Sequence, residues 1–342
     1  MQVAKSGIHF ATCHSATLPP ATCNLPLSTL MILTVTPNSA VDQTYFVSSF
    51  NKNSTIRASN SILSMAGKAA DASFILATLG YETVATGFAA GAVGKIMEGM
   101  MSERGAQSDF VQVNGETRLH SVIVDESDHT ASTLTTSTLQ VLPEHVTTLL
   151  QKCETLFKGA SCLVTGGTLP KGIKPEFYAD LITLARQHGL PVIFDAAEPF
   201  LSVGLTASPT YIKPNKDELA QFAGRQVDSL HEAHAIGRSI YERFGTQTII
   251  TLGGEGALAI LAHTSYWIPA LSVAVASPAG AGDAVLAGIA ASIERGQPIE
   301  EGLRLGIAAA AAVCMMPGTA DCRPEDVVRL KNEVQLQTFV DR

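Results

Sequence analysis

A glycine-rich turn near the C-terminal end of the chain carries a carboxylate at a position suited to proton transfer. The segment Ser277–Asp283 reads SPAGAGD, and the small residues after it predict a helix. Free N–H groups at a helix N-terminus bind anions, and glycine lets a phosphate approach closely. Gly280, Ala281 and Gly282 could therefore hold a transferring phosphoryl group. Asp283 could accept a proton from a hydroxyl, or it could only cap the helix.

A second polar motif, Lys213–Leu219 (KPNKDEL), follows an apolar strand and starts a helix. Asn215 and Glu218 are three residues apart and share a helix face, so that together they could hold a hydrated Mg²⁺. The competing interpretation is a capping box, in which Asn215 caps the helix and Glu218 reaches back to it.

A third motif, Thr251–Ala257 (TLGGEGA), places three glycines at the end of a strand. Gly253, Gly254 and Gly256 could let the backbone approach a nucleotide, or they could form a tight hairpin.

The N-terminal half carries further charged residues. Asn38 and Asp42 follow the first expected strand, close to where ligands bind in open α/β sheets. Lys68 lies at the start of a helix, where the helix dipole disfavours a cation. An anionic ligand would resolve that conflict, and the alternative is an exposed lysine. Arg118 could form a bidentate contact with a phosphate, or it could be a solvated strand residue.

The elements that must position these residues follow a regular order. From Met31 onward, apolar runs alternate with helical patterns, which predicts a doubly wound α/β domain with a mostly parallel sheet. The expected strands are Ile32–Thr36, Val84–Phe88, Cys162–Thr165, Val192–Asp195, Tyr211–Lys213 and Thr248–Leu252. The expected helices are Ala69–Leu79, Ala92–Arg104, Glu144–Phe157, Pro175–His188, Lys216–Phe222 and Leu230–Phe244.

Two polar segments interrupt this order. Tyr45–Leu63 and Val111–Leu134 are rich in Thr and Ser and alternate in polarity, which predicts strands with one wet face. We expect them to pair into a small sheet that covers a site as a lid, from about residues 43–63 and 111–135. Residues 1–30 are expected to be a disordered tail, 31–332 the domain and 333–342 a C-terminal tail.

Composition limits the function further. A net charge of −8 argues against nucleic acid as the main partner, because a phosphate backbone requires a basic surface. No apolar run approaches the ~18 residues of a membrane helix, and the first 30 residues lack the apolar stretch of a secretory signal. The six cysteines form no CxxC pair, which is typical of reduced thiols. These features together favour a cytoplasmic protein.

Taken together and in order, the motifs resemble those of the ribokinase-like carbohydrate kinases of the phosphofructokinase-B type, over about residues 31–332. The most similar branch is that of the 1-phosphofructokinases and tagatose-6-phosphate kinases. The similar segments are the opening strand Thr34–Asp42, the lid segment Gly115–Arg118, the turn Thr165–Gly172, the motif Lys213–Leu219, the glycine turn Leu252–Ala257 and the anion hole Gly280–Asp283.

The resemblance implies a ribokinase-like fold with a β-sheet lid, ATP and Mg²⁺ as cofactors, Asp283 as the base and a possible homodimer through the lid. The residues implied for ATP are Lys213, Asn215, Thr251, Gly253, Gly254 and Gly256, with Mg²⁺ near Asn215 and Glu218. The residues implied for the sugar phosphate are Asn38, Asp42, Gly67, Lys68, Asp71 and Arg118.

The chain also departs from the family pattern. The sugar loop, normally Gly-Gly-Lys-Gly-x-Asn, reads AGKAAD at Ala66–Asp71. Two methyl groups are added where backbone approaches sugar, and Asp71 replaces an amide donor by a carboxyl group. His120 stands where an asparagine is usual, and Pro278 and Ala279 replace the usual residues before the anion hole.

The leading hypothesis is transfer of the γ-phosphate of ATP to a hydroxyl of a hexose phosphate: fructose 1-phosphate, fructose 6-phosphate or tagatose 6-phosphate. Lys68 and Arg118 favour such a phosphorylated acceptor. A kinase for an unphosphorylated sugar or nucleoside would leave these two cations unused. A catalytically silent regulator that binds a sugar phosphate would have no need of Asp283.

Overall fold

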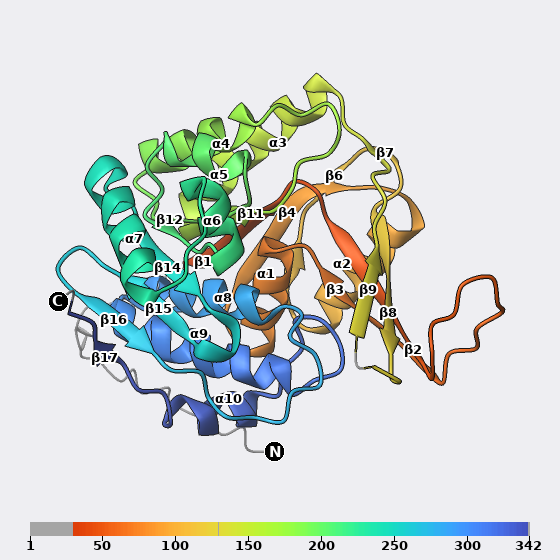
Figure 1. The fold of residues 1–342 in the computed structure, drawn as a ribbon. Coiled ribbons are helices and arrows are strands. Elements are labelled where there is room, and N and C mark those ends of the chain that lie inside the picture. The colour runs from red at the N-terminus through yellow and green to blue at the C-terminus, as the bar shows by residue number, and fades with distance from the viewer. Residues whose placement is uncertain (1–29, 129, 341–342) are drawn as a thin grey trace, which may run out of the picture.

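A large, mostly parallel sheet runs through the computed structural model, which describes residues 30–128 and 130–340 (Figure 1). The tail expected at residues 1–30 thus lies, except for Leu30, outside the described residues. Among the described residues eight of its strands run parallel, β6 (Val111–Gln112) among them, and β15–β17 continue the sheet antiparallel. The order across the sheet is β17 (Gln337–Thr338), β16 (Ser265–Ile268), β15 (Ala257–Ile260), β14 (Gln247–Thr251), β13 (Tyr211–Ile212), β12 (Val192–Asp195), β11 (Ala160–Gly166), β1 (Met31–Thr36), β4 (Thr83–Ala89) and β5 (Gln107–Ser108).

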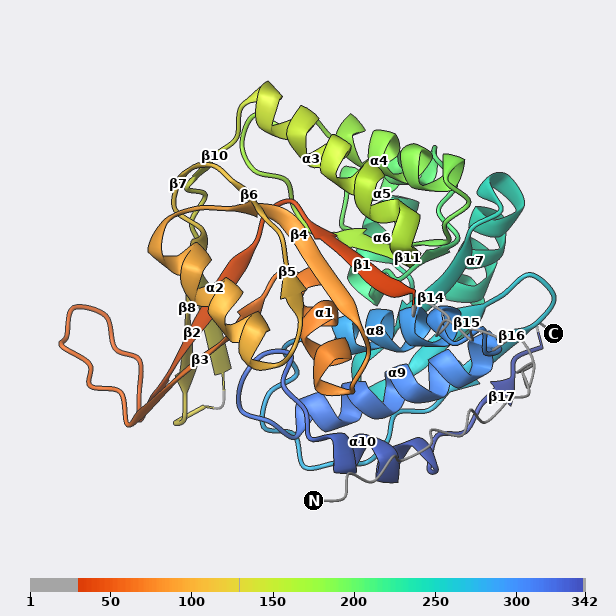
Figure 2. The ribbon, with the colours of Figure 1, turned by 180° about the vertical axis from the view of Figure 1, so that it is seen from behind.

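Helices cover both faces of this sheet (Figures 1 and 2). Successive residues of a strand point to opposite faces, so that Ile32 packs into one apolar cluster and Leu33 into the other. One face is covered by α1 (Ala69–Thr78), α8 (Ala281–Glu294), α9 (Ile299–Cys314) and α10 (Pro324–Lys331). The other is covered by α3 (Pro143–Leu156), α4 (Glu176–Gln187), α5 (Phe200–Leu205), α6 (Lys216–Ala223) and α7 (Leu230–Phe244).

The fold class predicted from the sequence is confirmed. All six expected strands and all six expected helices are present, with ends within two residues of those expected. The antiparallel end of the sheet was not expected. It includes β17, which lies in the segment expected to be a C-terminal tail and pairs with β16. None of the described helices is both long and apolar enough to cross a membrane.

A separate four-stranded sheet stands at one side of the large sheet (Figure 1). Its order is β3 (Asn60–Ala66), β2 (Ala40–Val47), β8 (Arg118–Asp125) and β9 (Thr130–Leu134). It differs in its limits from the expected lid, because β2 already starts at Ala40 and β3 runs on to Ala66. Asp42 therefore lies within a lid strand.

The segment after α2 (Gly91–Glu103) also differs from expectation. Val111–Gln112 forms β6 and pairs with β4 of the large sheet, so it is not part of the lid. Val111 is buried in the apolar core, and this burial outweighs the polar character of its neighbours. Two short strands, β7 (Asn114–Gly115) and β10 (Leu139–Gln140), pair with each other beside it.

Helices α8 and α9 pack backbone to backbone, and this contact fixes the helix that carries Asp283. A Cβ atom built on Gly288 of α8 would lie 2.3 Å from the backbone nitrogen of Gly306 in α9. Such an approach is below any van der Waals distance, so only glycine fits at residue 288.

We expect Gly288→Ala to force the two helices apart and to lower the free energy of unfolding by about 1–3 kcal/mol, as overpacking does. The matched control is Gly99→Ala in α2, where a Cβ meets no atom within 4 Å. That control should be neutral or gain up to about 1 kcal/mol from helix propensity. Equal denaturant midpoints for the two variants would contradict the packing argument.

Candidate active site

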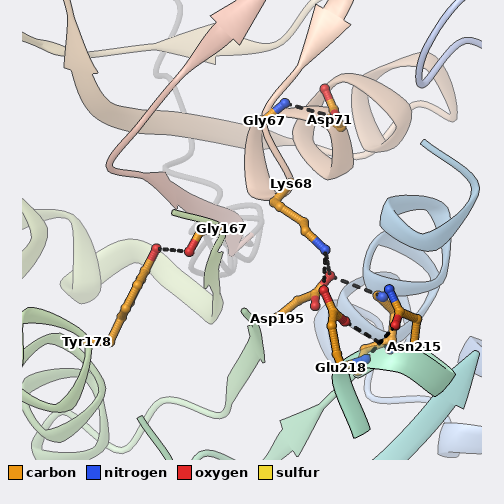
Figure 3. Close-up of polar contacts among 9 residues, drawn as sticks. Gly67, Lys68, Asp71, Gly167, Tyr178, Asp195, Asn215 and Glu218 are labelled. Carbon is orange, nitrogen blue, oxygen red and sulfur yellow. Dashed lines mark hydrogen bonds and ion pairs between the residues drawn. The ribbon is translucent and has the colours of Figure 1, made fainter. Parts of the chain in front are cut away.

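A buried carboxylate, Asp195, joins two lysines that come from distant parts of the chain; Figure 3 shows its contact with Lys68. Asp195 ends β12 and is 1% exposed. Its Oδ2 atom lies 3.0 Å from Nζ of Lys68 and 3.1 Å from Nζ of Lys213. Burial would raise the pKa of Asp195, but Lys213 and Lys68 outweigh burial and lower it. Asp195 is therefore ionised and fixes both ammonium groups at the carboxyl ends of the parallel strands, where ligands bind in such sheets.

The backbone at Lys68 is held in a conformation rare for a residue with a side chain. Its φ of 43° lies in the left-handed region, directly after Gly67 at φ 122°. Such local strain is typical of functional sites. The two alanines of this loop, Ala66 and Ala69, do not have positive φ: the first ends β3 and the second starts α1. The added methyl groups therefore require no unusual backbone conformation.

Lys68 is not the exposed lysine of the alternative interpretation. Its side chain is 32% exposed, and its ammonium group contacts Asp195 and lies 3.6 Å from Glu218. Burial would lower the pKa of Lys68, but Asp195, Asp283 and Glu218 outweigh burial and raise it. The amine is therefore positively charged at neutral pH.

The motif at the start of α6 forms the capping box. Asn215 Oδ1 accepts a hydrogen bond of 2.8 Å from the N–H of Glu218, and Glu218 Oε2 accepts one of 2.9 Å from the N–H of Asn215. Both side chains thus satisfy the first turn of the helix. Among the described residues, no group of three or more His, Cys, Asp and Glu side chains could hold a metal ion.

The N-terminus of α8 places Asp283 beside these charges. Gly280 caps the helix at φ 83°, and a Cβ there would lie 2.4 Å from the nitrogen of Ala320, so this position requires glycine. A Cβ at Gly282 would lie 3.2 Å from Nζ of Lys213, which shows that this ammonium group sits over the helix start. The Ala281 N–H makes a long turn bond of 3.3 Å to the carbonyl of Pro278.

Asp283 itself is buried, with 9% exposure. Burial raises the pKa of its carboxyl group, Lys68 lowers it and Asp195 raises it, with a net rise to about 6. A carboxylate with such a pKa is ionised at neutral pH and is basic enough to accept a proton. Together with the two lysines and the helix N-terminus, Asp283 can act on a neutral hydroxyl next to an anion.

These groups open onto one cavity of about 600 Å³. Its polar wall is formed by Lys68, Lys213, Asn215, Thr251, Gly253, Gly254, Gly256, Ala281, Gly282 and Asp283. Its apolar wall is formed by Leu271, Val273, Val275, Val285, Ile307 and Ala310, among others. Such a cavity, lined by charged groups and glycine backbone together with apolar side chains, can take up a ligand that has both anionic and apolar parts.

The glycine turn shares this cavity and also forms the hairpin of the alternative interpretation. Residues Gly253–Glu255 make a 3₁₀ turn between the antiparallel strands β14 and β15. Thr251 bridges to Asn215, and its N–H donates to the carbonyl of Pro214 over 3.0 Å. The turn and the start of α6 are therefore fixed side by side.

The residues expected for the sugar form a second group at the lid. Asp42 Oδ1 lies 2.9 Å from His120 Nδ1, and Asp42 Oδ2 accepts a hydrogen bond of 2.8 Å from Thr319. Arg118 donates to the backbone carbonyls of Asn38 and Ser39. Burial lowers the pKa of Arg118, and Asp42 partly opposes this shift. Arg118 is thus a half-buried cation anchored to backbone rather than a solvated strand residue.

Asp71 connects the two groups. It lies in the first turn of α1 and is 3% exposed. Its Oδ2 accepts a hydrogen bond of 3.0 Å from the N–H of Gly67 (Figure 3). Helix α1 packs against α8, and the charge of Asp283 at the start of α8 acts on Asp71. Burial, followed by the charges of Asp283 and Asp42, raises the pKa of Asp71 well above its usual range.

Sequence reasoning missed several residues of the site. Asp195 had a usable signal, because it is the one acidic residue that ends an expected buried strand. Thr319 had no such signal in the sequence, because it lies in a loop. The residues of the apolar wall had none either, because their sequence pattern is that of ordinary core residues. Thr168, which accepts from the side-chain amide of Asn38 at 2.9 Å, lies in the turn Thr165–Gly172 but was not singled out.

The chain is similar to known proteins over most of its length. The family model described as pfkB family carbohydrate kinase matches residues 35–326. Tagatose-6-phosphate kinase of Staphylococcus epidermidis is 32% identical over 285 residues, which cover 80% of this chain and 89% of that protein. 1-Phosphofructokinase of Haloferax volcanii is 30% identical over 313 residues, which cover 91% of this chain and 100% of that protein.

The crystal structure of phosphofructokinase-2 from Escherichia coli in complex with substrates and products superimposes with a TM-score of 0.84 at 22% identity, over 89% of this chain and 99% of that chain. At this identity the likeness shows the fold. The family match, which spans most of the chain, shows more: the chain belongs to the pfkB family of carbohydrate kinases.

Proposed function

We propose that this sugar kinase transfers the γ-phosphate of ATP to a hydroxyl of a hexose phosphate, and we assign the activity to residues 31–332. The observation that carries the proposal is the position of Asp283, a basic carboxylate at a helix N-terminus with Lys68 and Lys213 around it. Proton acceptor, anion-binding N–H groups and cations meet at the end of a cavity large enough for a nucleotide.

The shape of the cavity suggests how ATP binds. The apolar wall, including Val273, Val275 and Ile307, suits the adenine ring. The glycine turn lets backbone approach the phosphate chain, which would run toward Lys213 and the start of α8. Among the described residues no protein cage for a metal exists, so Mg²⁺ would be held mainly by the phosphates, with Glu218 and Asn215 contacting it through water. The ion would neutralise phosphate charge there.

The chemical step then uses groups that are already in position. Asp283 takes the proton of the acceptor hydroxyl, and the hydroxyl oxygen forms a bond to the γ-phosphorus. The bond from that phosphorus to the bridging oxygen breaks, and ADP leaves with its electron pair. The N–H groups of Ala281 and Gly282 stabilise the charge on the moving phosphoryl group.

The acceptor would bind between this centre and the lid. In this proposal Asp42 and Asn38 bind sugar hydroxyls, and Arg118 and Lys68 bind the phosphate of the acceptor. Two similar proteins named tagatose-6-phosphate kinase and 1-phosphofructokinase support a phosphorylated hexose, so tagatose 6-phosphate, fructose 1-phosphate and fructose 6-phosphate are the substrates to test. We place the reaction in the cytoplasm, where ATP is available.

A homodimer through the lid is a further part of the proposal. Strand register puts Leu63, Leu119, Leu134 and Tyr45 on one face of the lid sheet, and all four are exposed, from 37% to 63%. Apolar sheet faces of this kind can pack on each other.

We expect Leu134→Glu to shift the sedimentation coefficient from that of a dimer to that of a monomer. An unchanged sedimentation profile, or a wild type that is monomeric at micromolar concentration, would contradict the dimer.

We expect Asp283→Asn to lower kcat by at least about 10²-fold with every acceptor, because an amide cannot accept the proton. This variant should still bind ATP when binding is measured by calorimetry. The control variant Glu144→Gln, which changes an exposed acid in the first turn of α3, should keep the kcat of the wild type. Because Asp283 must be ionised, kcat of the wild type should fall as pH drops below about 6. Turnover by Asp283→Asn at the wild-type rate would contradict its role as base.

We expect Arg118→Gln to raise KM for the phosphorylated acceptor by about 10-fold or more, since a charge-assisted contact is worth about 1.5–3 kcal/mol, while KM for ATP stays unchanged. Arg57→Gln, an exposed cation between β2 and β3, is the matched control. If an unphosphorylated sugar or a nucleoside proves the better substrate and Arg118→Gln has no effect, the acceptor assignment is wrong.

A further inference from the structure

Asp71 is a buried acid with few groups to stabilise a negative charge. It is 3% exposed. One backbone N–H, that of Gly67, donates to its Oδ2, while its Oδ1 is buried and meets no donor among the described residues. Helix α1, which carries Asp71 in its first turn, packs against α8, which carries Asp283 in its first turn, and the charge of Asp283 acts on Asp71. Two carboxylates can hydrogen-bond only if a proton lies between them.

The nearby charges make this proton necessary. Asp283 of α8 and Asp42 of β2 are the charged groups that act most strongly on Asp71, and both are acidic. The two lysines of the site are engaged elsewhere, at Asp195. Two like charges that lie close together in a buried site do not both ionise readily, so we infer that one member of the pair holds a proton.

The same charges decide which member holds it. Asp283 faces Lys68 and Lys213 as well as Asp195 and Asp71, so a negative charge is favoured on Asp283. Asp71 lacks a comparable cation. Burial and its two acidic neighbours raise the pKa of Asp71 well above its usual range, whereas the pKa of Asp283 rises only to about 6.

We propose that Asp71 is a positioning residue that keeps a proton in the folded protein and donates it to Asp283 in a hydrogen bond. This hydrogen bond holds the Asp283 carboxylate ionised and oriented toward the acceptor hydroxyl. The protonation stands on the structure alone, and the consequence for catalysis rests on the proposed function. When Asp71 ionises at alkaline pH, the hydrogen bond is lost and a second negative charge appears beside the phosphoryl group.

The first test needs no activity. In the unfolded chain Asp71 ionises near pH 4, whereas in the folded protein it stays protonated to higher pH. The folded state therefore binds more protons, and the wild type loses stability as pH rises from about 4 to the folded-state pKa of Asp71. Asp71→Asn keeps a donor but cannot titrate. Its melting temperature should exceed that of the wild type by a difference that is small at pH 4.5 and grows toward pH 8.

A matched control and a contrary result make this test decisive. Asp180→Asn, which changes an exposed acid on α4, should show no pH-dependent difference. Asp71→Ala, which loses the donor, should melt below Asp71→Asn at each pH. If the difference in melting temperature between Asp71→Asn and the wild type does not change with pH, the proposal that Asp71 is protonated is wrong.

The second test addresses the effect on the base. With the acceptor that supports turnover, kcat of the wild type should fall at alkaline pH, and Asp71→Asn should lack this fall while it keeps the fall at acid pH. Asp71→Ala should have kcat at least about 10-fold lower across the range. An identical alkaline fall in wild type and Asp71→Asn would overturn the positioning role. If no acceptor supports turnover, the proposed function fails, and the melting series still decides whether Asp71 holds the proton.

Discussion

The charge pairing at Asp195 is the constraint on which the rest of the site depends. Two ammonium groups share one carboxylate oxygen at 3.0 and 3.1 Å, in a place almost closed to water. Buried charges are stable only when they are paired, so Lys68 and Lys213 cannot move without leaving Asp195 unpaired. Because Lys213 directly follows β13 and Lys68 directly precedes α1, the pairing ties the large sheet to the helix that follows lid strand β3.

The excess of acids over bases in this centre explains the behaviour of the remaining groups. Asp195 and Glu218 engage the lysines, and Asp71 has no comparable cation of its own. The pKa values of Asp71 and Asp283 are raised because burial penalises their charged forms more than the lysines compensate. A phosphate chain would meet the lysines and the start of α8, whereas a hydroxyl would meet Asp283. The same group of residues would therefore offer cations and N–H donors to the phosphate chain and a basic carboxylate to the hydroxyl.

The lid shows how the chain supplies the second half of the site. Its β2 pairs with β3 on one side and with β8 on the other, with Asp42 opposite Ser64 and His120. Thr319, from the loop after α9, closes onto Asp42. Three segments separated by up to 277 residues therefore meet at one carboxylate, and none of their contacts is local in sequence.

The sequence by itself determined the α/β order, the limits of the main elements within two residues, and the motifs at Asp283, Asn215 and Gly253–Gly256. It could do so because the period of hydrophobic residues and the signals for helices and turns are local properties of the chain. Tertiary structure decided what those motifs contact. Asn215 and Glu218 turned out to form a cap, and β6 and β17 joined the large sheet, because long-range pairing outweighs local propensity. The ionisation of Asp71 and Asp283 likewise depends on burial and on charges brought from other elements, which no single segment of sequence contains.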